Sequence, residues 1–307
     1  MEQLIDVNDY PVKNVLDKIL QDRSTGQNII FATDAYIDFD CDIKTQIKTD
    51  KLIGINAVPI QPRVLKSLKE QNQRTRQKAE VFTPSWICNK MNNHCDSEWF
   101  GRENVFNIER GHTWEAISEP VKFDDEKDWC SYVDSKRLEI TCGEAPYIVS
   151  RYDTTTAEII PIYNRIGILD RKIRIINENV DIEKKWIEWV YRAFQSVYGY
   201  EFQGDNLLIA RINLLITFVD YMQERWARVP TEKELTKVAD IIVWNFWQMD
   251  GITGTVPFGK PQTEYHQISF FDYMQGINDT EPEEVDCKIY DWINNEELTY
   301  RSIKEGR

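Results

Sequence analysis

The stretch SVYGYEFQGDNLLIARINLLITF, residues 196–218, contains the change of pattern that decides the fold. Its first part has the alternating side chains of a strand, and its second part has the apolar spacing of a helix. A single carboxylate, Glu201, falls at the junction, with Phe202 beside it. The order predicts a strand–turn–helix unit with an acid at the carboxyl end of the strand.

Similar units recur on both sides of this stretch. KRLEITCGEAPYIVSRY (136–152) predicts a strand and a glycine turn, and DIEKKWIEWVYRAFQSV (181–197) predicts an amphipathic helix. Thr231, followed three residues later by Glu234, predicts the start of another helix. ADIIVWNFWQMDG (239–251) is interpreted as a strand that ends at Asp250. Strands alternating with helices predict a parallel, doubly wound α/β sheet.

The chain divides into three parts by composition. Residues 1–78 are expected to form an N-terminal helical extension, with helices over 12–24 and 63–77. Residues 79–260 carry the strand and helix signals, so they are the expected core. Residues 261–307 are the expected acidic C-terminal tail.

Acidic residues dominate the charge balance. The 307 residues include 37 Lys and Arg against 51 Asp and Glu, a net charge of −14, which repels a phosphate backbone unless basic residues are segregated. Two stretches concentrate basic residues, 61–78 and 164–175. We interpret both as ordinary solvated faces rather than nucleic-acid contacts. The balance argues against an autonomous DNA-binding protein and favours one that acts with a partner.

Cysteine usage and hydropathy suggest a cytoplasmic protein. The six cysteines form no Cys-x-x-Cys pair, which is typical of reduced thiols. The N-terminus has no basic start followed by an apolar stretch, and no apolar run is long enough for a membrane span. The spacing of Cys88, His94 and Cys95 fits no common zinc site. We therefore expect no membrane association and no metal.

Three strand ends carry side chains suited to a nucleoside. An open parallel sheet binds ligands at the carboxyl ends of its strands. Gly143, after the strand with Glu139, would let the backbone approach a ligand closely. Glu201 would bind the ribose hydroxyls, and Asp250 would accept a hydrogen bond from an exocyclic amine. The three together predict a site that holds a nucleoside along its length.

These segments resemble S-adenosylmethionine-dependent adenine-specific DNA methyltransferases, in particular proteins labelled restriction endonuclease subunit M. EVFTPSWICNKM (80–91) is similar to the family's N-terminal cofactor motif, and LEITCGEAPY (138–147) is similar to its acid-x-x-x-Gly-x-Gly motif, with Ala145 in place of the second glycine. VYGYEFQGDNLLIARINLL (197–215) resembles the ribose-binding strand and helix, and NFWQMDG (245–251) the adenine-contacting motif. The resemblance covers about residues 79–255.

The resemblance implies a Rossmann-like methyltransferase fold and S-adenosylmethionine as the cofactor. In this family, Glu139, Thr141 and Gly143 would hold the methionine end of the cofactor. Glu201 would hold its ribose and Asp250 its adenine, against which Phe202 would pack. The implied set of cofactor-binding residues is completed by Thr83 and Pro84.

The family's catalytic motif is missing from this sequence. Methyl transfer to adenine depends on Asn/Asp/Ser-Pro-Pro-aromatic, whose side chain and carbonyl accept the amine protons while the ring stacks on the flipped base. No such tetrapeptide occurs, and the nearest stand-in is TVPFG (255–259), where Phe258 supplies a ring but Val256 no acceptor. The catalytic residues are therefore unassigned, and no target-recognition domain is expected after Asp250.

Two principal functions follow from this pattern. The first is a DNA adenine N6-methyltransferase-like modification subunit that binds S-adenosylmethionine and needs a restriction or specificity subunit to recognise DNA. The alternative is a catalytically inactive acidic protein on the same fold, an inhibitor or anti-defence factor that acts on a nucleic-acid-binding partner such as a defence nuclease. A small-molecule or protein methyltransferase is a third, weaker option.

Overall fold

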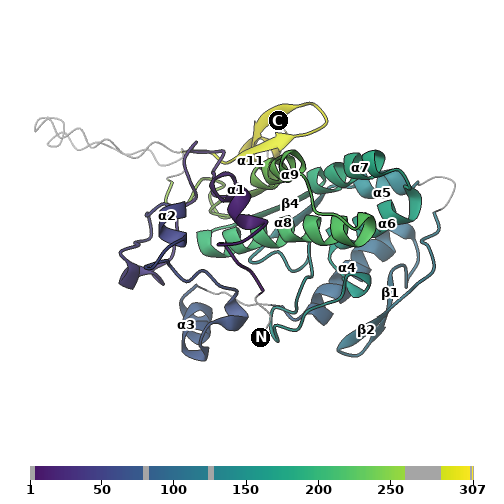
Figure 1. The fold of residues 1–307 in the computed structure, drawn as a ribbon, viewed down its shortest axis with the longest axis horizontal. Helices are drawn as coiled ribbons and strands as arrows, with labels where there is room; N and C mark the ends of the chain where they lie inside the picture. Colours follow the sequence, from purple (N-terminus) through teal and green to yellow (C-terminus); the bar gives the residue numbers. More distant parts are fainter. Residues whose placement is uncertain (1–3, 79–82, 124–127, 260–284, 305, 307) are drawn as a thin grey trace, which may run out of the picture.

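The computed structural model describes residues 4–78, 83–123, 128–259, 285–304 and 306 (Figure 1). Residues 79–82, at the start of the expected cofactor motif, and 260–284, in the expected acidic tail, lie outside the described residues. The longer helices are α1 (Val12–Ile19), α3 (Leu68–Lys78), α4 (Ser85–Phe100), α6 (Ile168–Asn179), α7 (Glu183–Gln195), α8 (Gly204–Trp226) and α9 (Glu232–Asn245). The short ones are α2 (Thr49–Leu52), α5 (Trp129–Asp134) and α11 (Tyr300–Lys304).

Within the described residues, the strands form three separate sheets. They are β1 (Asn107–Arg110), β2 (Thr113–Ala116), β3 (Arg137–Ile140), β4 (Val197–Glu201), β5 (Phe246–Gln248), β6 (Lys288–Asp291) and β7 (Glu296–Thr299). The central sheet is parallel with the order β3-β4-β5, and its register pairs Glu139 with Gly199 and Glu201 with Gln248. The hairpins β1-β2 and β6-β7 are antiparallel. The chain is thus an α/β protein with a parallel sheet and flanking helices.

Alternation along β4 assigns its side chains to two faces of the sheet. Val197 joins the main core, in which helices α6, α7, α8 and α9 pack together. Tyr200 points to the other face, where it packs with Trp247 and Ile289 in a second, smaller cluster. The C-terminal hairpin β6-β7, drawn in yellow above β4 in Figure 1, therefore covers this second face.

The N-terminal residues share the main core with the rest of the chain. Helix α1 packs against α9 and α8, and its Leu16 and Ile19 are buried. Residues 29–31 then cross the carboxyl end of β5, where the Ile30 amide donates to the side-chain oxygen of Gln248 (2.9 Å). The side-chain amide of Gln248 in turn donates to the Ile30 carbonyl (2.8 Å). This crossing brings the N-terminal segment to the strand ends that the sequence singled out.

One predicted strand is wrong over most of its length. Residues 239–245 belong to helix α9, and only Phe246–Gln248 form β5. The helix starts at the predicted capping box, in which the hydroxyl oxygen of Thr231 accepts the Glu234 amide. Its apolar residues Leu235, Val238 and Ile242 then recur at helical spacing and are buried. The capping box and this helical spacing favour a helix more strongly than the β-branched residues favour a strand.

Candidate functional site

A carboxylate and a glycine turn meet at the carboxyl ends of β3 and β4. Glu201 is 6% exposed, and its Oε2 accepts a hydrogen bond from the Gly143 amide (2.9 Å). Its Oε1 accepts from the amides of Phe202 (3.0 Å) and Gln203 (3.1 Å). Gly143 has a φ of +52°, a conformation that glycine adopts without strain. Glu201 therefore holds the turn after β3 against the end of β4.

Glu139 lies buried on the strand that leads into this turn. One of its oxygens accepts from the Tyr147 amide (3.4 Å), and the other, Oε2, has no hydrogen-bond partner. Burial raises the pKa of Glu139 well above its ordinary value, and the negative charge of Glu201 adds to this. An unpaired buried carboxyl oxygen costs free energy unless the group is protonated or a ligand donates to it. Glu139 is thus suited to meet a donor such as an ammonium group.

The raised pKa of Glu139 predicts that this residue lowers the free energy of unfolding in a pH-dependent way. A carboxyl whose folded pKa is raised stabilises the fold less as pH rises above its unfolded pKa of about 4.3, because it must then ionise while buried. We expect Glu139→Gln to gain stability relative to the wild type as pH rises from about 4 to about 7, because the amide has no proton to lose. Urea unfolding of both proteins across this range measures the change. Parallel stability curves would contradict the burial of an ionisable group at this position.

The described part of the expected N-terminal cofactor motif contacts the loop that follows the glycine turn. Pro84 is the residue before α4, so it stands at the helix boundary. The Thr83 carbonyl accepts from the Thr154 hydroxyl (3.0 Å), and the Thr83 side chain contacts the Tyr147 hydroxyl. The Tyr147 amide donates to Glu139, so Thr83 and Glu139 both contact Tyr147 in the loop after β3. Thr141 follows β3 and is exposed.

The third strand end is arranged differently. Asp250 follows β5, and its Oδ1 accepts from the amides of Ile252 (2.9 Å) and Thr253 (3.4 Å), so its hydrogen bonds stabilise its own turn. Phe258, from the nearest stand-in for a catalytic motif, packs edge-on against Phe202 with ring centroids 5.5 Å apart. The structure therefore places an aromatic pair beside Glu201, while the role of Asp250 stays a prediction.

A buried ionic cluster at the start of α8 was missed by sequence reasoning. Asp205, in the first turn of α8, accepts from Arg74 (2.7 Å), Lys66 (3.1 Å) and the hydroxyl of Tyr36 (2.8 Å). Arg74 also donates to the side chain of Gln203 (3.0 Å). A cavity of about 290 Å³ borders the cluster on the side of residues 33–39. The only sequence signal was the basic stretch 61–78, which gave no indication of its partner.

The expectation of solvated basic faces is wrong for the central residues of both stretches. Lys66, Arg74, Arg171 and Lys172 are all buried. Arg171 pairs with the buried Asp96, and Lys172 donates to the Val133 carbonyl (2.9 Å) and the Ser196 hydroxyl (2.6 Å). A buried cation is costly unless it is paired, which explains these partners. These four side chains are therefore buried and already bound to partners inside the fold.

Fold and site together define an α/β protein with a candidate ligand site at the carboxyl ends of two adjacent parallel strands. Comparisons with protein-family models, curated proteins and solved structures found no match to this chain. Among the described residues, no three His, Cys, Asp or Glu side chains gather closely enough to hold a metal ion. Within the same ranges, no helix, α8 included, combines the length and hydropathy needed to cross a bilayer.

Proposed function

We propose that the chain binds S-adenosylmethionine at the ends of β3 and β4, on a Rossmann-like fold of the methyltransferase type. The observation that carries this proposal is the pairing of a positive-φ glycine turn with a buried acid on the next parallel strand. Ligands of open parallel sheets bind at this edge, where a turn admits close backbone approach and an acid on the neighbouring strand suits a ribose. The family resemblance supports the same placement.

Each residue has a defined role in this proposal. Glu139 and the turn at Gly143 hold the methionine end, and the unpartnered oxygen of Glu139 receives the ammonium group. Glu201 accepts the ribose hydroxyls at the end of β4, where it also holds the turn after β3. Phe202 packs on the adenine, with Phe258 as the neighbouring ring.

The proposed activity is methyl transfer to an adenine amine of DNA, with a second subunit. This chain has no Asn/Asp/Ser-Pro-Pro-aromatic sequence to polarise the amine. Four of the basic side chains in its richest basic stretches are buried. A partner, such as a restriction or specificity subunit, therefore supplies the base site and most of the DNA contacts.

These same observations favour a second candidate, an acidic binding protein without catalysis. A net charge of −14 and the internal pairing of central basic residues suit a nucleic-acid-binding protein as partner better than DNA itself. In this case the chain acts as an inhibitor or anti-defence factor, and the site at the strand ends is part of the fold but binds no cofactor. Cofactor binding distinguishes the two candidates.

Glu201→Ala is expected to weaken S-adenosylmethionine binding at least 100-fold in calorimetric titration. Glu201 also holds the Gly143 turn, so its loss could weaken binding indirectly. Two nucleosides that differ only in their ribose hydroxyls separate this structural role from ribose binding. The wild type should bind adenosine more tightly than 2′,3′-dideoxyadenosine, and Glu201→Ala should lose this preference. Glu224→Ala, an exposed glutamate near the other end of α8, is the matched control and should bind like the wild type. A wild type that binds neither S-adenosylmethionine nor adenosine would refute the cofactor site and leave the acidic binding protein.

A further inference from the structure

Strand β3 has an open edge within the described part of the chain. The parallel sheet has the order β3-β4-β5, so β4 is the neighbour of β3 on one side only. The Arg137 amide donates to the Ser196 carbonyl (2.9 Å), which directs the backbone of Arg137 and Glu139 toward β4. By alternation, the N–H and C=O groups of Leu138 and Ile140 face the open edge. Such an edge can pair with another strand.

One face of β3 is also partly exposed to solvent. Parallel sheets are normally buried on both faces. Here Ile140 is 63% exposed and Leu138 44% exposed, because the β6-β7 hairpin covers only the β4 and β5 side of this face. Between hairpin and strand lies an apolar groove of about 230 Å³, lined mainly by Leu138, Tyr198, Trp247, Ile289, Leu298 and Tyr300. Edge, exposed face and groove together form a continuous surface that we call the β3 patch.

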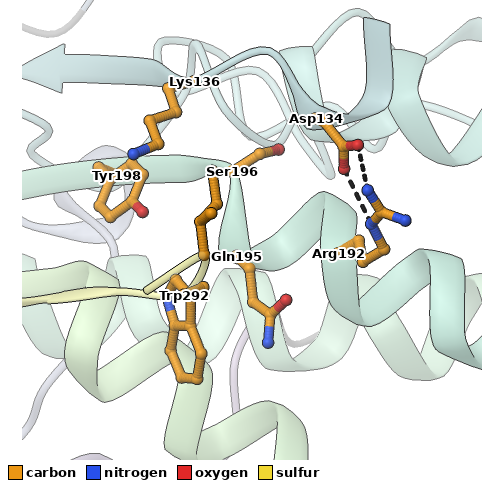
Figure 2. A pocket seen from close by; sticks show the side chains of 8 residues that line it. Asp134, Lys136, Arg192, Gln195, Ser196, Tyr198 and Trp292 are labelled. Carbon is orange, nitrogen blue, oxygen red and sulfur yellow. Dashed lines mark hydrogen bonds and ion pairs between the residues drawn. The ribbon is translucent and has the colours of Figure 1, made fainter. Parts of the chain in front are cut away.

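The β3 patch carries positive charge in an otherwise acidic protein. Lys136 lines the groove and is exposed, and Lys304 follows the exposed Ile303 on α11. Figure 2 shows Lys136 beside Tyr198 in the adjoining pocket, where Arg192 is already paired with Asp134. Asp291, the acid that lines the groove, accepts from the Ile293 amide (2.8 Å) of its own turn, which lowers its pKa, and the nearby charge of Lys136 lowers it further. With Lys136 and Arg137 against Asp291, the groove lining carries a net positive charge that complements carboxylates.

We infer that the β3 patch binds an extended apolar segment of a partner protein, flanked by acidic residues. The segment adds a strand beside β3 through main-chain hydrogen bonds and inserts an apolar side chain into the groove. A second copy of this chain fits poorly, because each copy carries a net charge of −14 and would place its own lysines at the same rim. A strand added parallel to β3 would end beside the Gly143 turn, so the partner also reaches the candidate site. The interface itself does not depend on cofactor binding.

Selection from a displayed library of random peptides of about twelve residues tests this inference. The wild type should enrich peptides with alternating apolar residues and Asp or Glu at their ends. A synthetic enriched peptide should bind at least tenfold more weakly to Ile140→Asp and to Leu138→Pro, which removes an N–H from the open edge. Ile182→Asp is the matched control, since Ile182 is 57% exposed and lies outside the patch, and it should bind like the wild type.

Other results would overturn the inference. They are the absence of enrichment, enrichment of lysine-flanked peptides, or equal binding by wild type and Ile140→Asp when circular dichroism shows both folded. A dimer of the full chain that Ile140→Asp dissociates would assign the patch to a second copy instead. Ile140→Asp should still bind S-adenosylmethionine normally, so failure of the interface and failure of the cofactor site are separable.

Discussion

Asp205→Asn is expected to destabilise the folded chain by about 3–5 kcal/mol, because it leaves two buried cations without their counter-charge. Asp205 is fully buried, and Lys66 and Arg74, its two cationic partners, are 7% and 5% exposed. Burial alone would raise the pKa of Asp205, but Lys66 and Arg74 hold it well below its ordinary value. Urea unfolding at pH 7 measures the loss.

The pH dependence of this effect has a defined sign. A carboxyl with a lowered folded pKa stabilises the fold above its unfolded pKa of about 3.9, and this stability is lost as pH falls through the folded value. The difference between wild type and Asp205→Asn should therefore shrink below about pH 4. Asp240→Asn is the matched control, since Asp240 pairs with Lys18 and Arg23 at the surface and should cost at most about 1 kcal/mol. Equal losses in the two variants would contradict a buried cluster.

Gly204→Ala is expected to cost about 3 kcal/mol, although alanine is the better helix former. A Cβ at Gly204 would lie 1.9 Å from the carbonyl oxygen of Ile30, which is backbone and cannot rotate away. The Gly204 amide also donates to the Phe31 carbonyl (2.9 Å). The substitution would therefore push the N-terminal segment off the start of α8, next to Glu201. Thermal unfolding and amide exchange of residues 28–32 measure both effects.

Gly101→Ala separates this collision from the general effect of replacing glycine. Gly101 ends α4 with a φ of +67° and nothing within 4 Å of its Cβ position, so alanine should cost only about 1 kcal/mol of backbone strain. A Gly204→Ala variant no less stable than Gly101→Ala would mean that residues 29–31 do not pack on α8 as described.

Local signals along the sequence predicted the elements that build the site. Strand β3, helix α7 and the strand–turn–helix unit at Glu201 were visible because each has its own periodicity and boundary residues. The capping box at Thr231 gave the start of α9, but its end was missed because buried helical and strand residues have the same composition. Short apolar runs do not distinguish the two.

Contacts between distant segments could not be predicted in the same way. Asp205 meets Lys66 and Arg74, which lie more than a hundred residues away in the sequence, because the chain folds this N-terminal segment onto the start of α8. Glu139 was expected near the ligand, but its missing partner and raised pKa depend on what packs around it. The open edge of β3 is likewise a property of the assembled sheet, since nothing in RLEI (137–140) distinguishes an edge strand from a central one.

Amide hydrogen exchange with and without S-adenosylmethionine locates a bound ligand on the chain and so tests the proposed cofactor site. We expect the ligand to slow exchange at residues 141–147, the turn after β3, and at 202–204, after β4. Exchange in the β1-β2 hairpin should stay unchanged and serves as the internal control. Protection confined to other segments, or no protection at saturating ligand, would contradict a cofactor site at the ends of these two strands.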